Sequence, residues 1–335
     1  MNNVNEPEIK TAPKISLNIW KFTWSGVLKA ISKGSLCVVN SDGTVRFYGE
    51  KSEQSAVMKI NDSSFYRKVI LGGSIALGEA YVEGLWSSPN LSKLLVVLSG
   101  NCEKFGFLQK GMSFFSRLMN RGLHLLRRNS KKKSLSNIQA HYDLSNEFYK
   151  TFLDKTMTYS SALFEGQEMS LESAQMNKIK RILNLSELEE GNRILEIGSG
   201  WGALAIEAAK RGCLVKTITL SKEQFELTQA RIREAGLEPA IEIYMQDYRE
   251  ERGLYDVVIS CEMIEAVGKE YLKEYFQVIR NTLKDKGRAV IQAITIRDQD
   301  YEDYARSCDW IQKHIFPGGH LPSLAIIKKH IAAIP

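Results

Sequence analysis

The chain has 335 residues, of which 44% are hydrophobic and 25% charged, and its formal net charge is +6. This length suggests about two domains, and the composition excludes a fibrous, largely disordered or disulfide-stapled chain. The longest aliphatic run, at 94–98, is too short to span a bilayer, and residues 1–10 lack the apolar stretch of a secretory signal, so we expect a cytoplasmic protein. Five widely spaced cysteines without zinc-ligand spacing predict reduced thiols and no metal site.

Residues 1–102 predict a small α+β domain. The segments Leu36–Asn40 and Val45–Tyr48 flank Ser41-Asp42-Gly43, a sequence typical of a β-hairpin because Asp-Gly accepts the positive φ of a tight turn. A third strand is predicted at Ala56–Ile60. The simplest interpretation of this domain is a structural module without chemistry of its own.

Residues 103–136 predict a basic amphipathic helix followed by a polar linker. Between Glu103 and Lys133 the net charge is +8, whereas the rest of the chain carries −2. Apolar residues among these charges indicate one apolar and one cationic helix face, which is typical of an element lying on a bilayer with anionic lipids. A core helix with a solvated basic face is the alternative. A nucleic-acid-binding arm would leave the apolar residues unexplained, so no nucleic-acid partner is expected.

From residue 192 onward, apolar strands alternate with helical patterns, as in a doubly wound α/β sheet. A helix is expected at Ala203–Lys210. The predicted strands are Arg193–Ile197, Leu214–Thr219, Ile241–Met245, Asp256–Cys261 and Ala289–Thr295. Open sheets of this kind bind ligands at the carboxyl ends of their strands.

Those strand ends carry glycines and polar residues. Glycine is needed where backbone must approach a ligand without an intervening Cβ. An acidic residue inside a buried strand needs a positively charged partner. The candidate residues are Glu196, Gly198, Gly200 and Gly202 at the first strand, Thr219, Ser221 and Gln224 at the second, and Gln246 and Asp247 at the third. Together they resemble the S-adenosylmethionine (SAM) site of class I methyltransferases.

The resemblance implies a role for each group. The three glycines would lie against the methionine and ribose of the cofactor. Ser221 and Gln224 stand where many relatives place a ribose-binding acid, so a hydroxyl and an amide would bind the sugar here. Asp247 would accept a hydrogen bond from the adenine amino group, and an ordinary turn aspartate is the alternative.

Further segments narrow the family. The chain looks like cyclopropane-fatty-acyl-phospholipid synthases from about residue 34 to its end, and the segments that carry the resemblance are 141–149, 157–164, 174–178, 263–268 and 315–323. The resemblance implies a Rossmann-like methyltransferase domain at 137–335, preceded by the small α+β domain.

Family chemistry transfers a methyl group from SAM to the cis double bond of an unsaturated phospholipid acyl chain, and loss of a proton then closes a cyclopropane ring. In the family a bound bicarbonate is the candidate base. By motif, Glu265 would hold it, together with Gln292, where the family has His, and the backbone at Ser161, where the family has Cys. Glutamine can donate a hydrogen bond but cannot carry the proton. Nearby Glu262 is interpreted as an ordinary loop carboxylate.

Other implied roles concern the segment before the glycine turn. Tyr159 and Ser160 would contact the methionine carboxylate or the ribose, and His141 would lie over the cofactor and the acyl chain, with a packed or capping histidine as the alternative. The family fold has two further strands and a Tyr beyond Pro335, so we expect a chain lacking its last strands.

The favoured function is therefore cyclopropane formation by an enzyme peripheral to the inner face of the membrane. A SAM-dependent fatty-acyl methyltransferase giving a methyl- or methylene-branched chain is the first alternative, and an inactive lipid- and SAM-binding protein is the second. Homodimer formation is left open.

Overall fold

The computed structural model describes residues 14–50, 54–105 and 145–334, which fall into two compact units divided near residue 122. The predicted basic helix and linker lie almost wholly outside the described residues. None of the described helices is long and apolar enough to cross a bilayer.

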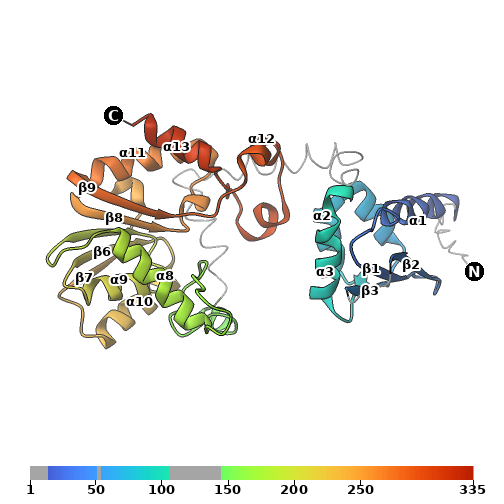
Figure 1. Ribbon diagram of the computed structural model, residues 1–335, viewed down its shortest axis with the longest axis horizontal. Helices are drawn as coiled ribbons and strands as arrows, with labels where there is room; N and C mark the ends of the chain where they lie inside the picture. Colours follow the sequence, from blue (N-terminus) through green and yellow to red (C-terminus); the bar gives the residue numbers. More distant parts are fainter. Residues whose placement is uncertain (1–13, 51–53, 106–144, 335) are drawn as a thin grey trace, which may run out of the picture. The chain divides into compact units, whose positions relative to one another are not determined.

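In the described residues up to Phe105, the N-terminal unit has a four-stranded mixed sheet and the helices α1, α2 and α3 (Figure 1). The sheet order is β2-β1-β3-β4, with β1 parallel to β3 and antiparallel to β2. Its elements are α1 (Lys14–Leu28), β1 (Ser35–Val39), β2 (Val45–Gly49), β3 (Ser55–Ile60), α2 (Ser64–Val82), β4 (Trp86–Ser87), α3 (Leu91–Gly100) and the 3₁₀ turn Cys102–Phe105. The predicted hairpin and third strand are confirmed.

One face of this sheet packs against the helices. Along β3 exposed and buried residues alternate, and the buried Met58 and Ile60 join Leu36 of β1 in the core. Trp24 of α1 and Phe65 of α2 complete it with an edge-to-face ring contact at 5.1 Å. Period-two alternation in the sequence is therefore the signal of a half-buried strand.

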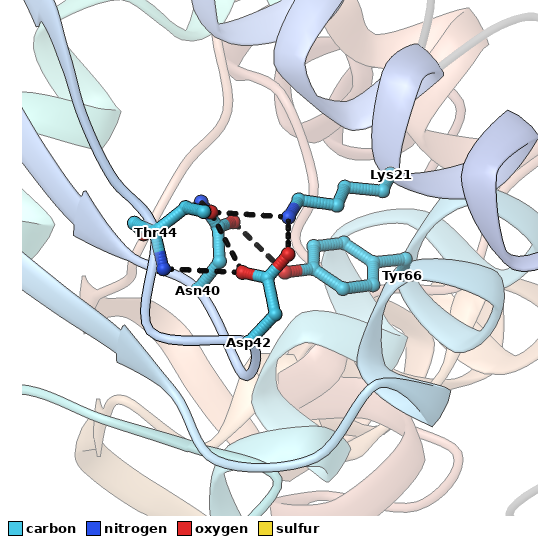
Figure 2. Close-up of polar contacts among 5 residues, drawn as sticks. All are labelled: Lys21, Asn40, Asp42, Thr44 and Tyr66. Atoms are coloured by element: carbon cyan, nitrogen blue, oxygen red, sulfur yellow. Dashed lines mark hydrogen bonds and ion pairs between the residues drawn. The ribbon is translucent and has the colours of Figure 1, made fainter.

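Polar contacts tie the hairpin turn to two helices (Figure 2). Lys21 of α1 donates to Asp42 at 2.6 Å, and Asp42 in turn accepts from the Thr44 hydroxyl at 2.6 Å. The buried Tyr66 of α2 donates to the side chain of Asn40 at 2.8 Å. The Lys21 ammonium and the Thr44 donors hold the pKa of Asp42 well below its usual range. The hairpin is thereby fixed at its tip as well as by its strands.

The C-terminal unit is a five-stranded parallel sheet of order β7-β6-β5-β8-β9. Its elements are α7 (Asn146–Lys150), α8 (Leu171–Leu185), β5 (Arg193–Ile197), α9 (Ala203–Ala209), β6 (Leu214–Thr219), α10 (Lys222–Glu234), β7 (Ile241–Met245), β8 (Tyr255–Cys261), α11 (Leu272–Thr282), β9 (Leu283–Gln292), α12 (Tyr301–Ala305), the π-helix Ile311–Ile315 and α13 (Leu324–Ala332). Short 3₁₀ turns lie at Tyr248–Glu250, Ile264–Ala266, Lys269–Tyr271 and Asp298–Asp300.

Helices cover both faces of this sheet (Figure 1). Residues of α8, α9 and α10 share one core with Ile194, Val215 and Val257 of the strands. Residues of α11 and α13 share the opposite core with Leu195 and Val258. The predicted doubly wound α/β class is confirmed.

The predicted last strand was wrong at both ends. β9 begins at Leu283, directly after α11, and its pairing with β8 shifts register between Tyr255 and Val257. It ends at Gln292, and just beyond it the Ile294 amide donates to the carboxylate of Glu265 instead of to a strand. The other predicted strands agree with the structure to within one residue.

Candidate active site

The parallel register brings four loops to one edge of the sheet. Ile197 at the end of β5 pairs with Ile218 of β6 and with Ser260 of β8, and Cys261 pairs with Gln292. The loops that follow β5, β6, β7 and β8 therefore emerge side by side, where an open α/β sheet binds its ligand.

The glycine turn after β5 has three left-handed residues. Gly198, Gly200 and Gly202 have φ values of 95°, 49° and 85°. A Cβ at Gly202 would lie 2.7 Å from Thr228 of α10, so this glycine serves close packing between helices. A Cβ at Gly200 would meet nothing within 4 Å, so the turn leaves open space beside this backbone. The outer part of the turn is thus suited to a ligand and the inner part to packing.

An aromatic cluster packs against the glycine turn. The Trp201 indole is buried, donates to Asn146 of α7 at 2.7 Å and lies 4.9 Å from the Tyr149 ring. Tyr149 in turn lies 5.3 Å from Tyr159. Arg231 of α10 donates to the carbonyl oxygen of Trp201 at 2.6 Å. The sequence prediction missed the roles of Trp201 and Arg231, because neither side chain belongs to a ligand-binding pattern.

Glu196 lies near the carboxyl end of β5 with its carboxyl group buried. Its side chain is 3% exposed and accepts from the Thr217 hydroxyl of β6 at 2.5 Å. Burial raises the pKa of Glu196 to about 8, against smaller lowering effects of the Thr217 hydrogen bond and of the charge of Lys178. The carboxyl group of Glu196 is therefore largely protonated at neutral pH. The positively charged partner that the sequence analysis expected for Glu196 is Lys178.

Lys178 of α8 holds the segment that carries Tyr159 and Ser160. Its ammonium group is buried, donates to the Ser160 hydroxyl at 2.5 Å and lies 3.8 Å from the Cys261 sulfur. Gln175, one turn earlier on α8, donates to the Ser160 carbonyl at 2.7 Å. The segment is thus fastened to the end of β8. Lys178 lies in segment 174–178, which carries the family resemblance, but this role was not predicted from the sequence.

The predicted ribose-binding residues organise the start of α10. Ser221 is the N-cap and accepts from the Gln224 amide at 3.2 Å. The Thr219 hydroxyl donates to the Gln224 side-chain oxygen at 2.8 Å. Ser221 and Gln224 are buried in this arrangement. Their contact with a sugar remains a prediction.

The residues after β7 form another paired group. Arg249 donates to both carboxylate oxygens of Asp247, at 2.8 Å and 2.5 Å, and Gln246 donates to Glu251 at 3.1 Å. A carboxylate can accept further hydrogen bonds beyond such a bidentate pair. The role of Asp247 toward an adenine amino group therefore remains a prediction.

Glu262, interpreted from the sequence as an ordinary loop carboxylate, accepts hydrogen bonds from two of the predicted catalytic residues, Ser161 and Gln292. Its Oε1 atom accepts from the Ser161 amide, the Ser161 hydroxyl and the Gln292 side-chain amide, each at 2.8 Å. Its backbone amide donates to the Gln292 carbonyl at 2.8 Å. Glu262 has a φ of 47°, a left-handed conformation that is uncommon for a residue with a side chain. No sequence pattern indicates either property.

Glu265 lies on the next turn with a different environment. One carboxylate oxygen accepts from the Ile294 amide, and the other is buried without a hydrogen-bond partner among the described residues. Burial raises the pKa of Glu265 to about 7, and the charge of Glu262 contributes to the rise. The two glutamates therefore differ in their hydrogen-bond partners. His141 lies outside the described residues.

Comparison with known proteins identifies the family. Residues 129–334 match the family described as mycolic acid cyclopropane synthetase. The chain belongs to this family. It is a SAM-dependent methyltransferase of the cyclopropane synthase family, which confirms the resemblance drawn from the sequence motifs.

Two similar proteins have names that describe different reactions. The chain is 37% identical over 310 residues to a tuberculostearic acid methyltransferase of Mycobacterium tuberculosis, covering 87% of this chain and 69% of that protein. It is 34% identical over 271 residues to the cyclopropane-fatty-acyl-phospholipid synthase of Escherichia coli, covering 80% of this chain and 68% of that protein.

Solved cyclopropane synthases share the fold. A cyclopropane synthase of Mycobacterium tuberculosis superposes with a TM-score of 0.55 at 31% identity, over 59% of this chain and 73% of that chain. A mycolic acid cyclopropane synthase solved with SAH and CTAB gives a TM-score of 0.54 at 30% identity over the same shares.

Proposed function

We propose that this methyltransferase transfers the methyl carbon of SAM to the cis double bond of an unsaturated phospholipid acyl chain and forms a cyclopropane ring. The observation that carries the proposal is the proximity of two loops. A Cβ on Gly198 would lie 3.4 Å from the Met263 side chain, so the glycine turn lies next to the loop that bears Glu262 and Glu265. A methyl donor held by the first loop would be close to proton-accepting groups on the second.

The cofactor would bind along the ends of β5, β6 and β7. The glycine turn supplies open backbone at Gly200, and Asp247 supplies carboxylate oxygens at the third strand end. Tyr159 and Ser160, held by α8, would lie over the methionine end. When bound, SAM supplies an electrophilic methyl group next to a sulfonium.

The chemistry explains why acidic groups and a closed environment are useful here. An alkene is a weak nucleophile, and attack on the methyl group leaves a carbocation that water would capture. The aromatic cluster around Tyr149 and Trp201 is suited to excluding water from the cofactor side. Loss of a proton from the added methyl group then closes the ring. In the family-based prediction a bound bicarbonate accepts this proton.

A methyl- or methylene-branched product is the second candidate. Gln292 at the position where the resemblance implies His favours it, because a changed environment of the cation alters which proton is lost. The relative named as a tuberculostearic acid methyltransferase supports the same alternative.

The basic segment 103–133 would hold the enzyme on its substrate surface. Its +8 charge in the sequence suits an anionic bilayer at the inner face of the membrane. This part of the proposal depends on the sequence alone.

The test uses the purified chain with phospholipid vesicles containing a monounsaturated acyl chain and isotopically labelled SAM. Transfer of the label to lipid supports the proposed function, and its absence at full SAM binding supports the inactive binding protein. A cyclopropane and a methylene-branched chain are isomers, so proton NMR must separate them. Ring-methylene signals support cyclopropane formation, and alkene-methylene signals support the branched product.

A further inference from the structure

The donors expected to hold a bicarbonate already have an acceptor within the protein. The Ser161 amide and hydroxyl each have one hydrogen, and both point to Oε1 of Glu262. The Gln292 amide nitrogen has two hydrogens, and its contacts are Oε1 of Glu262 at 2.8 Å and the Ser161 oxygens at 3.0 and 3.4 Å. A bicarbonate at this position would have to displace the Glu262 carboxylate. The described residues therefore do not fit the exogenous anion that the family resemblance implies.

The Glu262 carboxylate has the chemical properties of the bicarbonate whose expected position it occupies. A carboxylate and a bicarbonate are both planar oxyanions with two equivalent acceptor oxygens. Oε1 of Glu262 is held by three donors, whereas Oε2 has no hydrogen-bond partner among the residues that the structure describes. One oxygen is thus fixed in position, and the other is left to accept a proton.

Backbone geometry holds the carboxylate in this place. A φ of 47° at Glu262 is a strained conformation for a residue with a Cβ, and the pairing of its amide with the Gln292 carbonyl maintains it. Such conformations persist where the surrounding structure over-determines them, commonly at active sites. Glycine would remove the strain and the carboxylate together.

We propose that Glu262 is the catalytic base of this enzyme and takes the place of a bound bicarbonate. The inference rests on the proposed acyl-chain alkylation. The methyl carbon leaves the SAM sulfur and bonds to one alkene carbon, giving neutral S-adenosylhomocysteine and a carbocation. Oε2 of Glu262 takes one proton from the new methyl group, and the released C–H electron pair forms the second ring bond. The proton then leaves Glu262 to solvent, so that charge and atoms balance.

Glu265 is less suited to this step. Its buried carboxyl group is partly protonated at neutral pH, and one of its oxygens is occupied by the Ile294 amide. The second carboxylate oxygen of Glu265 is buried without a hydrogen-bond partner among the described residues, a feature that a bound anion or water would explain. The experiment therefore also measures whether turnover depends on bicarbonate.

The experiment compares wild type, Glu262→Gln and Glu262→Gly in CO₂-free buffer, with and without added bicarbonate. Wild type should turn over equally in both buffers. Glu262→Gln keeps the hydrogen-bond acceptor but not the base, so turnover should fall about 10²- to 10⁴-fold in both. Glu262→Gly removes the carboxylate and leaves the Ser161 and Gln292 donors to an added anion, so its turnover should fall similarly and rise with added bicarbonate or formate. SAM affinity by calorimetry should stay within a few-fold of wild type in both variants.

Glu187→Gly is the matched control. Glu187 also has a φ of 47°, and its exposed side chain pairs with Arg288 away from the strand ends that form the site. This variant should keep wild-type turnover. The inference is overturned if wild type loses activity without bicarbonate, or if Glu262→Gln turns over at the wild-type rate in CO₂-free buffer. Wild type that alkylates no lipid in either buffer would instead overturn the proposed function, and the inference with it.

Discussion

Replacing Glu196 with glutamine should abolish a pH dependence of stability that the buried carboxyl group creates. In the folded chain burial raises the pKa of Glu196 to about 8 from an ordinary value of 4.5. Because the folded pKa is the higher one, the stabilising contribution is complete below pH 4.5 and decreases as the pH rises toward 8. Between these values the unfolded chain has lost the proton and the folded chain retains it.

The magnitude follows from linkage. One proton retained only in the folded state gives a slope of about 1.4 kcal/mol per pH unit, and the full interval corresponds to about 5 kcal/mol. With the residue almost wholly buried, solvent screening does not diminish this value. Glutamine is neutral at every pH, and its side-chain oxygen can accept the hydrogen bond from the Thr217 hydroxyl. The variant should therefore match wild type near pH 5 and exceed it near pH 8.

Urea unfolding followed by circular dichroism at pH 5, 6, 7 and 8 measures this difference. Comparing the two proteins at each pH cancels contributions from every other titrating group. A difference in the free energy of unfolding that stays constant across the four pH values would refute the assignment of a neutral Glu196 in the folded state.

Three further predictions concern the hairpin, the cofactor turn and the basic segment. Tyr66→Phe should lower the free energy of unfolding by about 1–3 kcal/mol in denaturant titrations, because the buried side-chain oxygen of Asn40 loses its donor; an unchanged midpoint would contradict this. Gly200→Val should abolish SAM binding in calorimetry, whereas Gly43→Val, at another left-handed glycine with open surroundings, should bind SAM normally; equal affinities would place the cofactor elsewhere. Segment 103–133 should bind the chain to anionic vesicles in flotation assays with about 1 kcal/mol per basic residue, and salt should weaken binding through screening over about 8 Å; equal binding to neutral vesicles at low salt would argue against it.

The sequence by itself determined four of the five parallel strands and the position of the glycine turn. β5 and β6 have the predicted bounds because short apolar runs bounded by turn residues identify buried parallel strands. Gly198, Gly200 and Gly202 were recognisable because glycine is needed where backbone must approach a ligand without an intervening Cβ, and the structure adds that all three have positive φ. These signals are local, since each depends on residues close together in the chain.

The tertiary structure alone decided which carboxylate accepts hydrogen bonds from Ser161 and Gln292, two of the predicted catalytic residues. The sequence motif pointed to Glu265, but Glu262 accepts from Ser161, which lies 101 positions earlier, and from Gln292, which lies 30 positions later. Likewise Lys178 meets Ser160 and Cys261 only because α8 packs beside the end of β8. Such contacts join strand ends, helices and loops that are far apart in sequence. The chain pattern specifies which side chains are available at the sheet edge, and packing decides which of them share hydrogen bonds and which remain protonated.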